Sequence, residues 1–400
     1  MNKYDRGELL TALLFLAVFI TEMLCRRYTF LQKEYFGLFL NTPDYWSELW
    51  SGPRPLITLA VDFLSQFYRF VWAGPAIMAL CVTGIFLLVR IPLRRFQIPL
   101  AVLTAGAVLV MALLPESRMQ ERWAKVEFAS IHRQWDKVIQ TATPEAAQKD
   151  RVLIPYALLA HSERGTLPEN IFRYPVAGPE DIDLEGELTR HGYLFAALQA
   201  ECLGCTNEAI HNTFQTACTT THGTSIGLLR QLIKLNIAAG NKAMAHKYAT
   251  ILAQSPLNAG TARTALRYID ALPETGTLDA GPSETAAIVS HNTSRNLRLM
   301  AREGYFNDAA AARFRCLLLL QRDLSNLAAS FAPDEDIASL PLCYQQALCL
   351  VSDPDIQSRL STAVTSAFRQ YMDAYGQRPV KNGGTILPGS FWDYYFLDGF

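Results

Sequence analysis

Residues 9–25 read LLTALLFLAVFITEMLC, and this apolar run, together with VWAGPAIMALCVTGIFLLV at 71–89 and IPLAVLTAGAVLVMALL at 98–114, decides the architecture. The lengths of 17, 19 and 17 residues approach the ~20 residues that a helix needs to cross the hydrocarbon layer of a bilayer. We therefore predict transmembrane helices at these three runs, inside a membrane domain that covers 1–115. The segment 26–70 between the first two runs is predicted to lie at the membrane interface.

The composition of the whole chain points away from nucleic acid as a partner. The formal net charge is −1 over 400 residues, and charged residues make up 18%, below the ~25% of an average globular protein. Such a chain has no general positive field that would attract a polyanion. Aromatic residues at 11% are too frequent for a disordered chain. We expect a lipid bilayer as one partner and no nucleic acid.

The connection between the second and third runs predicts the orientation. It is short and carries Arg90, Arg94 and Arg95, which the positive-inside rule places in the cytoplasm. We therefore expect a multi-pass protein of the bacterial inner membrane, with a cytoplasmic N-terminus and a periplasmic C-terminal domain. The basic residues of the interfacial segment oppose this orientation, since they would face outward: Arg26, Arg27, Lys33, Arg54 and Arg69.

The interfacial segment 26–70 is too aromatic for a plain loop, and part of it has helical periodicity. Within 56–70 one helical stripe contains Leu59, Phe63, Phe67 and Phe70. This pattern is typical of a helix in the headgroup plane. A lid packed against the rest of the protein is the alternative.

Polar residues of the same segment provide weak binding candidates. Asp44 and Asp62, with Trp46, are the candidates, and Glu48 adds a third carboxylate. The carboxylates either line a pocket among the aromatic side chains or are ordinary solvated groups.

The remainder, 116–390, shows helical signals and a recurring turn pattern. Gly204, Gly240 and Gly304 each precede an alanine by five residues, at Ala209, Ala245 and Ala309. Glycine supplies the positive φ that ends a helix, and alanine permits close packing of the next helix. The 36 residues between Gly204 and Gly240 are near the tetratricopeptide (TPR) period of 34 residues. We predict an all-α fold in which the transmembrane helices precede a TPR-like α-solenoid of helical hairpins, with inserted loops at 165–180 and 272–285.

The sequence contains no pattern that indicates catalysis, a cofactor or a metal site. Cys202 and Cys205 form a Cys-x-x-Cys pair, but a tetrahedral zinc site needs a second ligand pair. The pair spans a predicted turn between helices, so we interpret it as structural, with redox chemistry or a local disulfide as alternatives. The seven histidines are scattered and include no pair four residues apart. We predict no catalytic, cofactor-binding or metal-binding residues.

The chain closes on a predicted aromatic tail, FWDYYFLDGF, over 391–400. An aromatic run of this kind is an aggregation hazard if water surrounds it. We expect it to dock into the last groove of the helical array or onto the membrane. Trp392 and Tyr394 are the binding candidates, because recognition of a partner is the alternative.

Several segments resemble an uncharacterised membrane-protein family common in Bacteroidota. They are YTFLQKEYFGLFLNTPDY at 28–45, DFLSQFY at 62–68, QWDK at 134–137, LCYQQAL at 342–348 and SFWDYYF at 390–396. The resemblance implies N-terminal membrane helices, more of them in many members, and a TPR-like C-terminal part. That family has no assigned activity, so the resemblance implies no functional residues.

Together these observations predict a non-enzymatic scaffold. We expect a membrane-anchored helical-repeat protein that binds a protein or peptide partner in the bacterial envelope. The alternative is an envelope enzyme or transport component that acts on lipid or glycan at the membrane face of 26–70. Two of its carboxylates within about 10 Å of each other, as acid–base pairs require, would favour that alternative.

Overall fold

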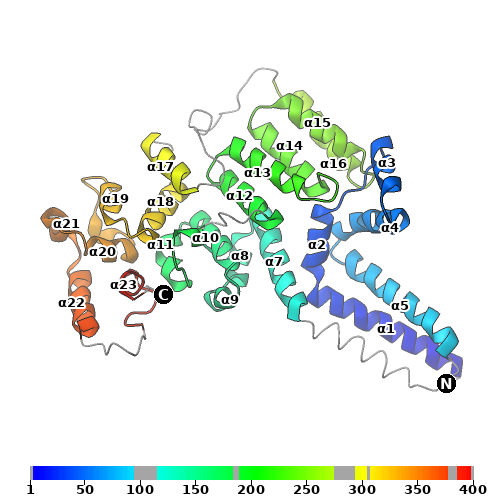
Figure 1. Cartoon of the computed structure of the whole chain (residues 1–400), viewed down its shortest axis with the longest axis horizontal. Coiled ribbons are helices and arrows are strands. Elements are labelled where there is room, and N and C mark those ends of the chain that lie inside the picture. Colours follow the sequence, from blue (N-terminus) through cyan, green and yellow to red (C-terminus); the bar gives the residue numbers. More distant parts are fainter. Residues whose placement is uncertain are drawn as a thin grey trace. The chain divides into compact units, whose positions relative to one another are not determined.

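The protein is all-α in the part of the chain that the structure describes (Figure 1), which confirms the predicted fold class at this level. The computed structural model describes residues 3–93, 115–182, 189–273, 293–303, 307–376 and 385–397. The apolar run at 98–114 lies outside these residues. Among the described residues, no helix combines the length and the apolar character that a membrane crossing requires.

The helices group into two compact units that do not follow chain order. Unit 1 comprises described residues of 1–128 and 213–278, and unit 2 comprises those of 129–212 and 279–400. Unit 1 contains α1 (Lys3–Cys25), α2 (Arg27–Phe36), α3 (Pro43–Ser51), α4 (Pro55–Ser65), η1 (Gln66–Arg69), α5 (Ala73–Leu93), α14 (Ile226–Ala238), α15 (Lys242–Ala253) and α16 (Ala259–Ala271). Two helices cross the unit boundaries: α7 (Pro115–Ile131) and α13 (Thr206–Cys218).

Unit 2 is built from shorter helices than α1 and α5. Its elements are α8 (Trp135–Thr141), α9 (Pro144–Lys149), α10 (Leu153–Glu163), α11 (Leu167–Asn170), η2 (Ile171–Arg173), η3 (Pro179–Ile182), α12 (Arg190–Cys202), α17 (Thr293–Glu303), α18 (Asp308–Leu320), α19 (Leu324–Ala329), η5 (Ile337–Ser339), α20 (Leu342–Leu348), α21 (Pro354–Arg359), α22 (Thr362–Gly376) and α23 (Phe391–Phe396). Proline opens α3, α4, α9 and α21, where its missing N–H costs no helical hydrogen bond.

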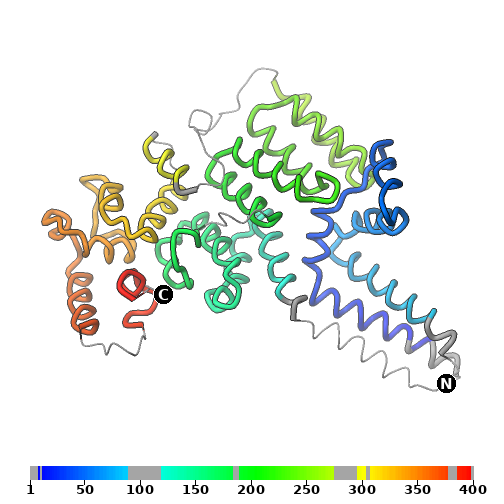
Figure 2. The backbone as a smooth tube through the Cα atoms, viewed as in Figure 1, coloured from blue at the N-terminus to red at the C-terminus, as the bar shows by residue number. Residues whose placement is uncertain are grey.

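In unit 1, α1 and α5 lie side by side along most of their length (Figures 1 and 2). Their contact is made by Leu14, Val18 and Ala79, which are buried, with phenylalanine side chains packed around them. At the end of α1, the carboxylate of Glu22 is buried, and its Oε1 lies 3.5 Å from Nη1 of Arg26. The side chains that α1 and α5 turn away from each other remain exposed.

The segment between α1 and α5 packs against α14–α16 within unit 1. The carbonyl of Gly37 accepts from the amide of Ile226 at 2.9 Å, and Arg69 donates to the carbonyl of Leu257 at 2.7 Å. A Cβ at Gly227 would come within 2.2 Å of the Tyr35 ring, so a glycine is needed where α2 meets α14. This packing corresponds to the lid alternative, while part of α4 keeps an exposed apolar face.

The helical hairpins of both units share one turn geometry. In the turn after α12, the amide of Cys205 donates to the carbonyl of Ala200 at 2.8 Å, and Gly204 donates to Glu201 at 3.2 Å. These are the two bonds of a Schellman cap, which requires a left-handed residue between the helices. The same pair of bonds recurs at the left-handed residues Arg133, Gly165, Gly204, Gly240 and Arg322.

The predicted alanine position is a core position in most of these turns. Five residues after the left-handed residue, a fully buried side chain packs between the two helices: Val138, Ala209, Ala245 and Leu327. Gly304 lies outside the described residues, and Ala309 is half-buried. The spacing therefore reflects a local rule of helix packing, in which the cap and the first inward side chain have a constant separation.

The short helix α23 is part of the core of unit 2. Trp392 is 1% exposed, and its indole N–H donates to the carbonyl of Gln346 at 2.8 Å. The hydroxyl of Tyr394 donates to the carbonyl of Leu320 at 2.6 Å. Asp393 accepts from the hydroxyl of Tyr371 at 3.0 Å. The helix α23 thus packs against α18, α20 and α22.

Candidate functional site

A cluster of hydrogen-bonded polar side chains in unit 1 lies where α3 meets α4. Thr42 caps α3 by accepting from the amide of Tyr45 at 3.3 Å. One helical turn apart, Tyr45 and Leu49 form the buried face of α3. The hydroxyl of Tyr45 donates to Oδ2 of Asp62 on α4 at 2.7 Å. One of the predicted candidate residues, Asp62, is therefore a buried carboxylate with a fixed tyrosine donor.

His222 completes this cluster from a distant part of the sequence. It lies in the turn between α13 and α14, next to Gly223, which has a φ of +64°. Its Nε2 lies 3.3 Å from Oδ2 of Asp62, and its Nδ1 lies 3.2 Å from Oε1 of Glu48. We call Tyr45, Glu48, Asp62 and His222 the His222 cluster.

The electrostatics of the His222 cluster favour a charged imidazole. The hydrogen bond to Asp62 raises the pKa of His222 against the opposing effect of burial, and Glu48 adds to the increase. With a carboxylate at each ring nitrogen, both nitrogens act as donors, as only the imidazolium permits. Burial, together with the bond to Asp62, raises the pKa of Tyr45, so its hydroxyl stays protonated.

Aromatic rings enclose the buried side of the His222 cluster. The ring of Phe39 lies 5.5 Å from that of Tyr45 and 5.5 Å from that of Phe63, in edge-to-face contacts. Trp46, another predicted candidate, packs on Phe39 at 6.2 Å and donates its indole N–H to Asn41 at 3.2 Å. Trp46 therefore supports the wall of the cluster and has no polar contact with His222.

The three carboxylates of this segment have different environments. Asp62 is buried, whereas the side chain of Glu48 is 57% exposed. Asp44 lies exposed in the first turn of α3, where a negative charge favours the helix dipole. The structure thus brings Glu48 and Asp62 together through His222 and leaves Asp44 apart.

Chemically, the His222 cluster is a continuous path of hydrogen bonds. It runs from the buried phenol of Tyr45 through Asp62 and His222 to the exposed Glu48. A path of this kind can hold or move a proton between the interior and solvent. It also ties α3 and α4 to the turn before α14, which is a structural role.

The other two sequence candidates, Trp392 and Tyr394, lie in the core of unit 2. Besides the bonds of their ring polar atoms to the backbone, Tyr394 stacks under the guanidinium of Arg322 at 5.2 Å. The carbonyl of Tyr394 also accepts from Arg322 at 3.0 Å. Trp392 and Tyr394 therefore both make their polar contacts with other residues of this chain.

The Cys-x-x-Cys pair consists of two separate buried thiols. Burial raises the pKa of Cys202 to about 12 and that of Cys205 to about 11. Arg133 donates to the sulfur of Cys202 at 3.1 Å, and Cys205 lies 3.8 Å from the sulfur of Met300. Both thiols are free in this structure. Because a reactive cysteine needs a lowered pKa, this environment fits the structural interpretation.

Within the described ranges, no group of three histidine, cysteine, aspartate or glutamate side chains is arranged to hold a metal ion.

Comparison with known proteins adds a family but no activity. No curated protein and no solved structure matches this chain. A family of unknown function, DUF6057, matches residues 3–119 and 109–398. Since these matches cover nearly the whole chain, the protein belongs to the family of unknown function DUF6057.

Proposed function

We propose that this protein is a membrane-anchored helical scaffold that binds a protein or peptide partner in the bacterial envelope. One observation carries the anchoring part: the outer faces of α1 and α5 are apolar and exposed. On α1 the exposed apolar side chains form a continuous stripe at helical spacing: Leu9, Leu13, Leu16, Ile20 and Leu24, each at least 46% exposed. On α5 the exposed residues include Leu80, Ile85 and Leu88.

An apolar surface of this extent is costly in water. Each exposed Å² of apolar surface costs about 25 cal/mol relative to burial, and large continuous patches mark surfaces for lipid or for another protein. The stripe lies within the first apolar run at 9–25, and the exposed residues of α5 lie within the run at 71–89. A bilayer is therefore the occupant that we propose for this surface, and the third apolar run of the sequence, at 98–114, would enter the same bilayer.

The scaffold part of the proposal is supported by the repeated caps and helical hairpins. Helix pairs joined by the same turn are the building units of TPR-like and other α-solenoids, which bind peptides and helices on their exposed surfaces. The arginines at 90–95 support a cytoplasmic N-terminus and a periplasmic C-terminal part in an inner membrane.

Three measurements test this function. Membrane flotation after alkaline extraction should recover the full-length chain with lipid, and a reporter active on one side of the membrane, fused after Phe400, should report the periplasm. Crosslinking in intact membranes followed by affinity capture should recover one stoichiometric partner. Recovery of the chain in the aqueous fraction would contradict the anchor, and repeated capture of the chain alone would contradict the scaffold.

A second candidate function is an envelope enzyme or transport component that acts on lipid or glycan. The observation that favours it is the His222 cluster, because Glu48 and Asp62 contact opposite nitrogens of one imidazole. Complementation of a deletion strain distinguishes the two functions. If a proton relay is essential, Asp62→Asn and His222→Gln should both fail to complement at normal protein levels, whereas a scaffold should tolerate both.

A further inference from the structure

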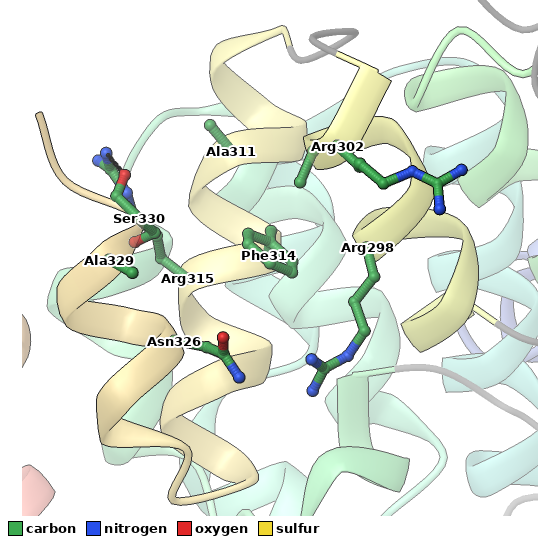
Figure 3. A pocket seen from close by; sticks show the side chains of 9 residues that line it. Arg298, Arg302, Ala311, Phe314, Arg315, Asn326, Ala329 and Ser330 are labelled. Carbon is green, nitrogen blue, oxygen red and sulfur yellow. Dashed lines mark hydrogen bonds between the residues drawn. The ribbon is translucent and has the colours of Figure 1, made fainter.

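We propose that a cavity in unit 2 binds the carboxylate groups of an acidic peptide segment. The cavity lies between α17, α18 and α19 and has a volume of about 510 Å³ (Figure 3). This size falls within the ~300–1,000 Å³ of typical ligand pockets. The proposal rests on the scaffold function proposed above and names the chemical class of the bound partner.

The charge of the cavity wall is positive. Arg298 and Arg302 extend from α17, and Arg315 extends from α18. The other residues that line it are neutral: Ala301, Ala311, Phe314, Asn326, Ala329 and Ser330. The described lining thus contains three guanidinium groups and no carboxylate. Beside it, the carboxylates of Asp323 and Glu335 lie 3.4 Å from Arg298 and Arg315, respectively, which leaves these five side chains with a net positive charge for an anionic ligand.

Two of these guanidinium groups are held in place but keep donors available. Nη2 of Arg298 donates to Gln321 at 2.7 Å and to Asp323 at 3.4 Å. Nη2 of Arg315 donates to the carbonyl of Ser330 at 2.9 Å and to Oε2 of Glu335 at 3.4 Å. For both arginines, Nε and Nη1 make no hydrogen bond to any residue that the structure describes. A guanidinium fixed at one nitrogen is preorganised to bind a carboxylate with the others.

The arrangement of the lining favours a peptide over a compact inorganic anion. Arg298 and Arg302 lie one helical turn apart, roughly 6 Å along the axis of α17. The aromatic ring of Phe314 lies in the middle of the lining (Figure 3). Positive groups separated by apolar surface match a ligand whose carboxylates alternate with apolar side chains. Inorganic phosphate presents a single charge centre and would leave Phe314 uncovered.

A direct binding measurement tests the proposal. Full-length protein in detergent micelles is titrated into a fluorescein-labelled peptide of alternating Glu and Leu, and binding is followed by fluorescence anisotropy. A matched peptide with Gln in place of Glu should bind at least tenfold more weakly. Arg298→Gln should weaken binding of the Glu peptide about tenfold, since one charge-assisted contact is lost. Arg267→Gln, at an exposed position of α16, is the control and should bind like the wild type.

A second variant keeps the test decisive if Arg298→Gln does not fold. Ala329 lines the cavity from an exposed position, so Ala329→Glu removes no polar contact and adds a repelling charge. It should also weaken binding of the Glu peptide at least tenfold. Wild-type affinity in Ala329→Glu, equal binding of the Gln peptide, or complete displacement of the Glu peptide by equimolar inorganic phosphate would each overturn the proposal. Flotation and partner capture do not depend on Arg298, so the scaffold function can stand if this site fails.

Discussion

Two regions rich in apolar side chains have opposite environments. The α1–α5 pair in unit 1 presents a stripe of aliphatic side chains that stays exposed, whereas the aromatic helix α23 in unit 2 is buried within its own unit. Three aromatic side chains of α23 carry a polar atom, and those of Trp392 and Tyr394 reach backbone carbonyls at 2.8 and 2.6 Å. The leucines and isoleucines of α1 and α5 have no polar atom in their side chains.

This contrast shows that apolar composition alone does not tell which surface will cover a segment. A short aromatic helix with hydrogen-bonding side chains fits a groove of its own chain, where each polar atom finds a partner. A long aliphatic helix fits a solvent without hydrogen-bonding groups. Variants that change one region at a time therefore test which surface covers each apolar segment.

The largest effect is expected on the exposed stripe of α1. Leu13→Asp combined with Ile20→Asp should move the protein from the floating membrane fraction to the aqueous fraction or to aggregates. Each aspartate near the centre of a membrane helix costs about 2.5–3.5 kcal/mol. The measurement is flotation of extracted membranes.

The control places the same two substitutions on a helix that we do not assign to the membrane. Thr261 and Tyr268 are exposed and seven residues apart on α16, as Leu13 and Ile20 are on α1. Thr261→Asp with Tyr268→Asp should float like the wild type. Equal flotation of both double variants would show that the α1 stripe is not the lipid contact.

The next largest effect is expected in α23. Trp392→Ala removes a fully buried ring and leaves the carbonyl of Gln346 without its donor, so it should lower the free energy of unfolding of unit 2 by about 3–5 kcal/mol. Urea unfolding, followed by protease sensitivity of the C-terminal half, measures the loss. Tyr268→Ala, at an exposed aromatic residue of α16, should change stability by less than about 0.5 kcal/mol.

The parts of the fold that could be predicted from the sequence are those with a local physical cause. The caps at Gly204 and Gly240 were predictable, because glycine favours positive φ at a helix end. The left-handed conformation of Arg133 and Arg322 was not, since a non-glycine residue gives no such signal. The stretch 165–180, predicted as a loop, instead contains α11 and η2 with buried Leu167.

The candidate site was only partly predictable for the same reason. The aromatic and acidic content of 26–70 pointed to Asp62, but the sequence around His222 contains no signal that pairs it with this carboxylate. Its role depends on packing between the α3–α4 region and the turn before α14, which is a long-range contact. One local signal was available: His222 precedes a glycine between two helical segments, a position where a turn projects its side chain.

A smaller effect is expected in the pH dependence of stability, where the tyrosine–carboxylate pairs of the two units can be compared. In unit 1, Asp62 accepts from Tyr45 and from the titratable His222. In unit 2, Asp393 accepts from Tyr371 and from the backbone amides of Ile386 and Leu387. We expect only the first pair to make stability depend on pH near neutrality.

The direction of this pH dependence follows from the raised pKa of His222. A raised pKa in the folded state means that the proton stabilises the fold, fully below the unfolded value of about 6.5. This contribution is lost as the pH rises through the higher folded pKa. His222→Gln should therefore cost about 1–2 kcal/mol at pH 5.5, and less at pH 8.5. Urea midpoints at the two pH values measure this, and a constant cost would contradict a charged imidazole.

The smallest effect separates the contribution of backbone conformation to stability from that of side-chain packing. The substitutions in the apolar regions do not distinguish these two contributions. A Cβ at Gly204 or at Gly260 would meet no atom within 4 Å, but Gly204 has a φ of +78° and Gly260 lies in the first turn of α16. Gly204→Ala should lower the free energy of unfolding by about 1 kcal/mol, because a side chain strains the left-handed cap. Gly260→Ala should raise it by about 0.5–1 kcal/mol through helix propensity. Changes of opposite sign in the free energy of thermal unfolding would show that the caps contribute to stability through the value of φ alone. This contribution would not depend on whether lipid or protein covers the helices that a cap joins.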